Sequence, residues 1–200
     1  MVLLLSCLVL AAAVPKEASL DAVLAALQRS PAWRASFVQR YLPEGLEQGV
    51  SETGELTLAP PARLRFDYQG ESPRTFASDG AVARLVDPLA GTCDAVHVDA
   101  ATWGRIPLAV LLDPGAARGA FTIGVAGQTL RLVPRQRVPE LSELLITVGD
   151  GGLPAAVVVL DAAGNRNEFR LQDWRPLAAS AAELFRPSLP GGTPCLPVEE

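Results

Sequence analysis

Alternation of apolar and polar residues along positions 54–80 predicts two neighbouring β-strands that share one apolar face. The apolar positions of the two strands are Leu56, Leu58, Leu64, Phe66 and Tyr68. Pro60 and Pro61 end the first strand because proline cannot donate a ladder hydrogen bond, and Ser78-Asp79-Gly80 has the residues of a polar turn. The pattern is that of an antiparallel meander with one apolar side.

Residues 17–40 contain the main helical candidate. Apolar residues recur at helical spacing from Leu20 to Leu27, and Ser19 is suited to cap the start of the helix. Ser30-Pro31 breaks this run, and alternation typical of a strand follows from Ser36 to Tyr41.

A second apolar segment, between residues 101 and 119, predicts a short helix that Pro107 opens and Asp113-Pro114-Gly115 stops. A surface helix of a small domain does not leave so many large apolar groups in water, so we expect the segment to cover a core or a cavity. Its candidate lid residues are Trp103, Ile106, Leu108, Leu111 and Leu112.

The rest of the chain predicts further hairpins, which are expected at 81–86 with 93–98, 121–125 with 130–132, and 144–148 with 155–160 and 168–171. About ten strands and two helical segments predict a mainly β (α+β) fold. We expect a strongly curved antiparallel sheet, or incomplete β-barrel, covered by helices.

The first thirteen residues read as an export signal with cleavage near Ala13, although the usual positive charges are missing and the true start could lie upstream of Met1. The alternatives are a buried N-terminal element, or a lipobox whose Cys7 is acylated. Residues 14–200 then form a single domain.

A net charge of −5 without a basic stripe argues against a nucleic-acid partner. His97 is the only histidine, and it lies in an alternating stretch with no hydrolase motif around it. No spacing of His or Cys is typical of a metal site. We therefore expect no enzyme, no metal and no cofactor.

Three cysteines occur, and Cys7 lies inside the expected signal. Cys93 and Cys195 remain as a pair in the mature chain. In an oxidising compartment an even pair suggests a disulfide, and Cys93 and Cys195 are the candidates.

The order of several short phrases resembles the family of periplasmic outer-membrane lipoprotein carriers, the LolA family, over nearly the whole mature length. The phrases are Ala35-Ser36-Phe37-Val38-Gln39, Gly54-Glu55-Leu56-Thr57-Leu58, Leu64-Arg65-Phe66-Asp67-Tyr68, Ser78-Asp79-Gly80, Leu130-Arg131-Leu132-Val133-Pro134, Asp161 with Gly164-Asn165, and Phe185-Arg186-Pro187. The resemblance implies an incomplete barrel under a helical lid, with an apolar cavity for the acyl chains of a lipoprotein.

The implied function is a monomeric periplasmic carrier that takes acylated lipoproteins from an inner-membrane ABC-type release complex to an outer-membrane receptor. The alternatives are a LolA-like sensor or lipid-binding domain that ferries no cargo, and a lipid-anchored LolB-like receptor if Cys7 is acylated. The residues predicted for the cavity and lid are the ten apolar ones given above. One departure from the family is Pro60, which stands where relatives often carry a basic residue. Alternation directs Arg63 and Arg65 away from the cavity, so neither replaces it unless a bulge intervenes.

Overall fold

The computed structural model of the chain describes residues 18–99, 108–112, 114–179, 181–191, 193 and 195–197. The expected signal with Cys7, and the lid candidates Trp103 and Ile106, lie outside the described residues. None of the helices in the described ranges is long and apolar enough to cross a membrane.

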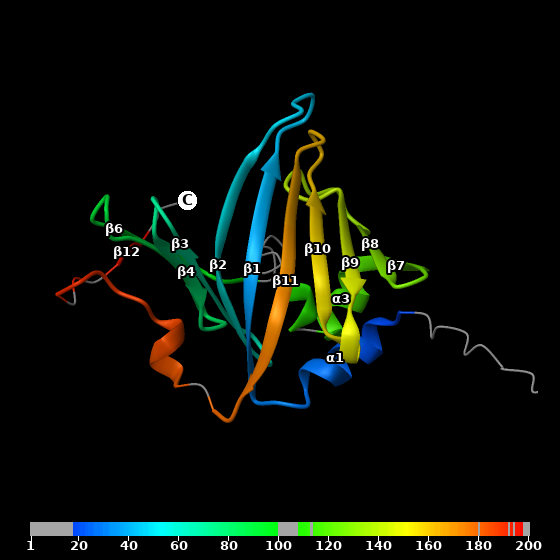
Figure 1. The fold of residues 1–200 in the computed structure, drawn as a ribbon, viewed down its shortest axis with the longest axis horizontal. Helices are drawn as coiled ribbons and strands as arrows, with labels where there is room; N and C mark the ends of the chain where they lie inside the picture. Colours follow the sequence, from blue (N-terminus) through cyan, green and yellow to red (C-terminus); the bar gives the residue numbers. More distant parts are fainter. Residues whose placement is uncertain are drawn as a thin grey trace, which may run out of the picture.

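Within these ranges, twelve strands form one sheet in the order β12-β6-β5-β4-β3-β2-β1-β11-β10-β9-β8-β7. Neighbours pair antiparallel, except that β12 runs parallel to β6. Figure 1 shows β6 and β12 at one side of the curved sheet and β7 at the other. The strands are β1 (Ala32–Leu42), β2 (Val50–Ala59), β3 (Arg63–Gln69), β4 (Arg74–Ser78), β5 (Val82–Asp87), β6 (Thr92–His97), β7 (Phe121–Ala126), β8 (Thr129–Pro134), β9 (Glu143–Val148), β10 (Pro154–Leu160), β11 (Arg166–Leu177) and β12 (Leu196–Pro197). The expected mainly β fold with a curved antiparallel sheet is confirmed.

The first helix, α1 (Leu20–Leu27), is much shorter than the 17–40 candidate region, and β1 starts at Ala32 rather than Ser36. Ser19 caps the helix as expected, because its Oγ accepts the N–H of Ala22 at 3.1 Å. The early start of β1 has a tertiary cause: Ala32 and Trp33 pair with the far end of β11, at Leu177 and Pro176. A partner so distant along the chain leaves no local signal in the sequence.

The segment before β7 also departs from the prediction. Residues 109–111 form one 3-10 turn, η1 (Ala109–Leu111), and the chain then continues as α3 (Pro114–Ala120) where a stop was predicted. The reason is the position of the proline. Pro114 is the first residue of α3, where its missing N–H would have no helical partner anyway.

The main core lies on the inner, concave face of the sheet, where α1, η1 and α3 pack. Four aromatic rings form its centre. The Phe37 ring lies 5.6 Å from that of Phe66, 5.2 Å from Tyr68 and 6.1 Å from Phe169, all edge to face. Such pairs add about 1 kcal/mol each beyond the area that they bury.

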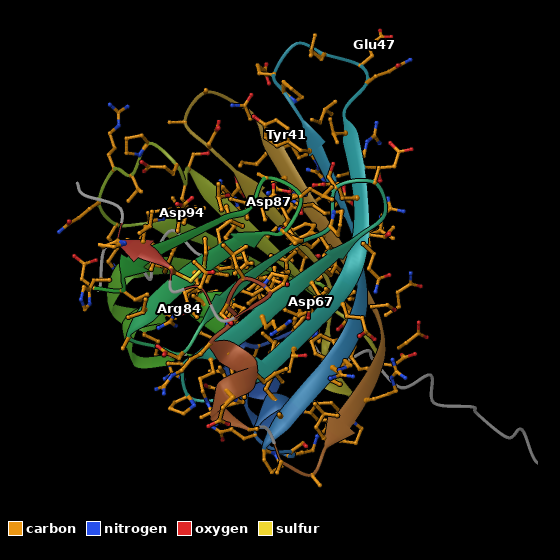
Figure 2. The ribbon with its side chains drawn as sticks, turned by 90° about the vertical axis from the view of Figure 1, so that its left-hand side faces the viewer. Tyr41, Glu47, Asp67, Arg84, Asp87 and Asp94 are labelled. Atoms are coloured by element: carbon orange, nitrogen blue, oxygen red, sulfur yellow. A yellow bond between two sulfur atoms is a disulfide. The ribbon has the colours of Figure 1, made fainter. Side chains whose placement is uncertain are left out.

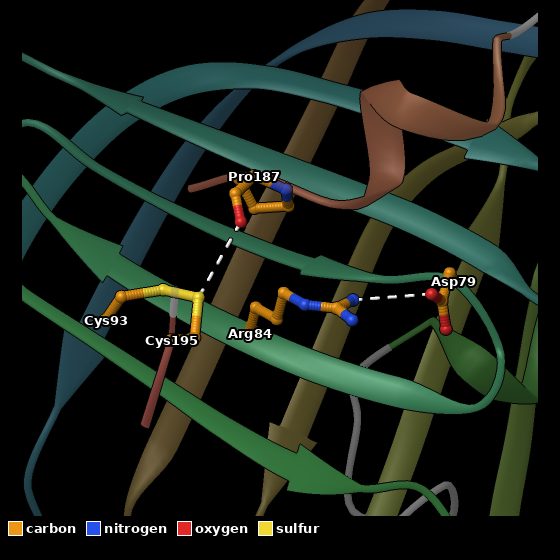
Figure 3. Close-up of a disulfide and its surroundings, with 5 residues drawn as sticks. All are labelled: Asp79, Arg84, Cys93, Pro187 and Cys195. Carbon is orange, nitrogen blue, oxygen red and sulfur yellow. Dashed lines mark hydrogen bonds and ion pairs between the residues drawn. A yellow bond between two sulfur atoms is a disulfide. The ribbon is translucent and has the colours of Figure 1, made fainter. Parts of the chain in front are cut away.

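The convex face carries the C-terminal strap, defined as η3 (Ala182–Phe185), residues 186–191 and β12 (Figure 2). Phe185 is fully buried against Ala32 and Ala59 on this face. The Arg65 guanidinium donates to the carbonyl of Leu184 at 2.7 Å. A disulfide between Cys93 and Cys195 holds the far end of the strap to β6, with the two Cα atoms 4.5 Å apart (Figure 3).

Asp79, in the turn between β4 and β5, anchors the middle of the strap. Its Oδ2 accepts from Arg186 of the strap at 2.8 Å and from Arg84 at 3.3 Å (Figure 3 shows the Arg84 bond), while its Oδ1 accepts the N–H groups of Ala81 and Val82. Burial acts to raise the pKa of Asp79, but these donors together lower it to about 2. The carboxylate is therefore charged at every physiological pH.

Candidate functional site

The cavity residues predicted on β2 and β3 lie side by side on the inner face. Leu56 is opposite Phe66, and Leu58 is opposite Leu64. All four are buried, and Tyr68 packs partly buried against the same cluster. Cross-strand pairs of this kind place the predicted residues in one continuous apolar patch.

The Phe37 ring lies close to the backbone of β2 and so belongs to this patch. Gly54 of β2 is opposite Phe37, and a Cβ built on it would lie 2.7 Å from the Phe37 ring and would collide with the carbonyl oxygen of Asp67. Only glycine leaves room for the ring to lie over β2.

The described lid candidates pack on the same face. Leu108, Leu111 and Leu112 are at most 3% exposed and belong to the same cluster as Phe37 and Phe66. Leu108 does so with a left-handed backbone, φ 70°, which is unusual for a residue with a side chain. The segment 108–112 therefore fills part of the inner face with the chain's own leucines.

Towards both side edges, the inner face is left open to solvent. Leu85 of β5 is opposite Phe76, which is opposite Phe66, so Leu85 shares the inner face and is 39% exposed. On the other wing, Val125 of β7 is opposite the buried Leu130 and is 47% exposed. These wing residues were not singled out from the sequence, although the alternation in the 81–86 strand could have indicated Leu85.

The tip of the β1–β2 hairpin carries two more apolar side chains, but the polar pair Gln39 and Glu52 separates them from the aromatic rings on the same face. Tyr41 and Val50 are opposite each other, four residues beyond Phe37 and Gly54, and are 41% and 63% exposed. Figure 1 shows this hairpin rising above the rest of the sheet. The apolar surface therefore reaches solvent at the two wings, whereas polar side chains separate it from the hairpin tip.

One charged pair lies at the border of this surface. Arg74 donates two hydrogen bonds to the carboxylate of Glu52, at 2.6 and 2.7 Å, and its guanidinium lies 4.0 Å above the Tyr68 ring. The bond to Arg74 lowers the pKa of Glu52, and burial raises the pKa of Tyr68 to about 12. The Tyr68 phenol therefore stays neutral. The opposite charges of Arg74 and Glu52 neutralise each other.

The arginines near Pro61 lie on the opposite face, as alternation predicts. Arg65 pairs with Asp67 at 2.7 Å, and the Arg63 guanidinium lies 5.2 Å from the centre of the Phe185 ring. Both therefore hold the strap on the convex face and lie away from the inner face.

The Ser78-Asp79 pair is structural. The Ser78 Oγ is buried and accepts the N–H of Gly80, and Asp79 is engaged by the strap. The geometry of the site is that of an apolar surface bordered towards the hairpin tip by polar side chains, the Arg74–Glu52 ion pair and the Gln39–Asn167 hydrogen bond, which suits the binding of hydrocarbon.

Known families and solved structures include proteins similar to this chain. Residues 29–188 match the model of the family described as outer membrane lipoprotein carrier protein LolA. An uncharacterised conserved protein from Thermus thermophilus superposes with a TM-score of 0.55 at 11% identity, over 90% of this chain and 96% of its own, so the two share a fold.

Two further solved structures are more distant. A LolA superfamily protein from Nitrosomonas europaea has a TM-score of 0.48 at 8% identity, over 83% of this chain and 94% of its own. A chain of the MucA/MucB complex from Pseudomonas aeruginosa has a TM-score of 0.47 at 16% identity, over 84% of this chain and 59% of its own. No curated protein sequence matches the chain.

Proposed function

Because the chain belongs to the LolA family of outer membrane lipoprotein carriers, we propose that it binds the acyl chains of lipoproteins on its inner face and carries them from the inner to the outer membrane. The observation that carries the proposal is the continuity of the inner face. Buried aromatic rings at its centre run into exposed apolar side chains at both wings.

The physical need for such a surface is large. Each methylene group that leaves water contributes about 0.8 kcal/mol, so a triacylated cysteine cannot cross an aqueous compartment uncovered. Leu85 and Val125 offer the first contacts, and the leucines of 108–112 are displaced when the chains enter deeper. No chemical step is required, which agrees with a family of carriers rather than enzymes.

The disulfide and the family indicate a protein outside the cytoplasm. In the proposed cycle the protein is a periplasmic monomer, loaded by an inner-membrane ABC-type release complex and unloaded at an outer-membrane receptor. The cavity would be formed by the predicted residues of β2, β3 and the segment 108–112, with Trp103 and Ile106 as further lid residues.

The test uses a synthetic peptide whose N-terminal cysteine carries three acyl chains. We expect the wild-type protein to bind it, and Leu85→Glu to weaken binding at least about tenfold, since a carboxylate at this position must be desolvated by the hydrocarbon. Leu89→Glu is the matched control, because Leu89 is 70% exposed in the next turn and off the inner-face row.

Both variants keep their melting temperature within a few degrees, since both leucines are exposed. If the wild-type protein binds neither the acylated peptide nor a fluorescent fatty acid, the proposed function is wrong. If Leu85→Glu binds as tightly as Leu89→Glu, the wing is not part of the site.

A second measurement separates a carrier from a sensor that keeps its ligand. The loaded protein is mixed with acceptor vesicles that contain an outer-membrane receptor, and transfer of the acylated peptide is followed over time. A carrier releases its cargo to the receptor, whereas a sensor or storage domain retains it.

A further inference from the structure

The two edge strands of the sheet differ in whether another strand covers them. The β6 edge is covered by β12, whose Pro197 lacks an N–H, and the Cys93–Cys195 disulfide fixes this cover. The β7 edge has no partner strand in the described part of the chain, because β7 stands last in the sheet order (Figure 1).

The sequence of β7 lacks the usual protections of an exposed edge. Phe-Thr-Ile-Gly-Val-Ala contains no charge and no proline, and it is six residues long. Thr122, Gly124, Val125 and Ala126 are exposed, whereas Phe121 at the start of the strand is buried and Ile123 is half-buried.

The ladder with β8 fixes which backbone groups are free. Arg135 donates its N–H to the carbonyl of Ala120 at 2.8 Å, so the even-numbered residues of β7 bond to β8. Because bonding alternates along an antiparallel pair, the N–H and C=O groups of Ile123 and Val125 point outward from the sheet.

The same odd-numbered residues turn their side chains to the inner face. Val125 begins a cross-strand row that continues through Leu130, Ile146 and Val157 to Phe169 in the aromatic centre. A strand added to β7 would therefore extend the proposed acyl-binding surface and lie directly beside it.

We propose that the β7 edge binds the extended polypeptide that follows the acylated cysteine of the cargo, by adding it to the sheet as a further strand. The inference rests on the proposed function and names a second part of the same ligand. The acyl chains hold the cysteine at the inner face, so the residues that follow it reach β7 at an effective concentration of about millimolar. Main-chain bonds suit this task, because they accept any cargo sequence without proline at the paired positions.

A second copy of the chain is the less suitable occupant. Pairing of two six-residue strands buries far less than the roughly 1,200 Å² of a stable interface. A tethered peptide does not need so large an area, since its association is intramolecular once the acyl chains are bound.

The test compares two ligands, the triacylated cysteine followed by a ten-residue peptide and the triacylated cysteine amide without a peptide. In wild-type protein the amide protons of Ile123 and Val125 should become protected from hydrogen exchange by the first ligand and not by the second. Those of Thr122 and Gly124 are bonded to β8 and serve as internal controls.

A variant pair isolates the edge bond. Val125→Pro removes an outward N–H without breaking the ladder to β8 and should weaken binding of the peptide-bearing ligand about tenfold. Val125→Ala loses side-chain contact but keeps the N–H. The ratio of its affinities for the two ligands should therefore stay within about twofold of the wild-type ratio.

Equal protection of Ile123 and Val125 by both ligands would overturn the inference and leave the proposed function standing. Protection that rises with protein concentration in the absence of ligand would overturn it in favour of a second copy. Failure of both ligands to bind would instead count against the proposed function. The exchange measurement needs no variant, so it decides the matter even if Val125→Pro does not fold.

Discussion

Asparagine in place of Asp79 should detach the C-terminal strap with little change to the turn itself. In Asp79→Asn the Oδ1 atom can still accept the N–H groups of Ala81 and Val82. The second oxygen becomes an NH₂ group, which faces the guanidinium groups of Arg84 and Arg186 with donors on both sides. Both ion pairs are lost, and the side chain is only 8% exposed, so water cannot replace them fully.

The size of the effect follows from the pKa of Asp79. Lowering it from 3.8 to about 2 corresponds to about 2 kcal/mol of stability at neutral pH. Because the pKa is depressed in the folded state, this contribution is complete above the unfolded pKa and is lost as the pH falls through about 2. The difference between the two proteins should therefore be about 2 kcal/mol at pH 7, about half of that at pH 3, and near zero at about pH 1.5.

Urea unfolding of both proteins at pH 7, 5, 4 and 3, with the disulfide intact, measures this difference. Asp87→Asn is the matched control. Asp87 accepts the N–H groups of Leu89 and Ala90 in the next turn, without a guanidinium bonded to it among the described residues. We expect a loss below about 0.5 kcal/mol for it. A loss in Asp79→Asn that does not change between pH 7 and pH 3 would refute the electrostatic account of the anchor.

Three other perturbations test the packing. Gly54→Ala should destabilise the protein by about 2 kcal/mol or more in thermal unfolding, since its methyl group meets the Phe37 ring and the Asp67 carbonyl. Gly124→Ala is the control and should be nearly neutral, because the nearest atom to its methyl group lies 3.9 Å away. Replacing both Cys93 and Cys195 by alanine should lower the unfolding free energy by about 4 kcal/mol, because the bond closes a loop of 102 residues; an unchanged urea midpoint would show that the strap holds without it. Leu108→Gly should be no more destabilising than Leu108→Ala, although it removes more atoms, because only glycine adopts φ 70° without strain; chemical denaturation of the two variants decides the order.

Local patterns in the sequence predicted the strands and helices that nearby residues determine. Period-two alternation located β2 and β3 to within a few residues, and Ser19 located the start of α1. The first residues of β1 were missed because their strand character comes from pairing with β11, far along the chain. The helix after Asp113 was missed because a proline in the first position of a helix looks, in sequence, like the end of one.

The candidate site was predictable in its buried part only. Large apolar residues at alternating positions indicate an inner face, so Leu56, Phe66 and Leu111 were found. Exposure depends on which strands end at an edge of the sheet, and this is a property of the strand order. Leu85 and Val125 read as ordinary strand residues, and only the order of strands shows that they border solvent.

The different roles of the two faces have a consequence for binding. Much of the stabilisation outside the central core lies on the convex face, in the buried Phe185, the Asp79 anchor and the disulfide. The wings of the inner face therefore need not be filled by the chain itself, and apolar side chains can remain there partly in water. An exposed apolar surface lowers stability and solubility, so a fold retains it where a ligand covers it. A protein that must open its inner face to hydrocarbon and still stay folded is best held together from the other side, which is where this chain places its strap.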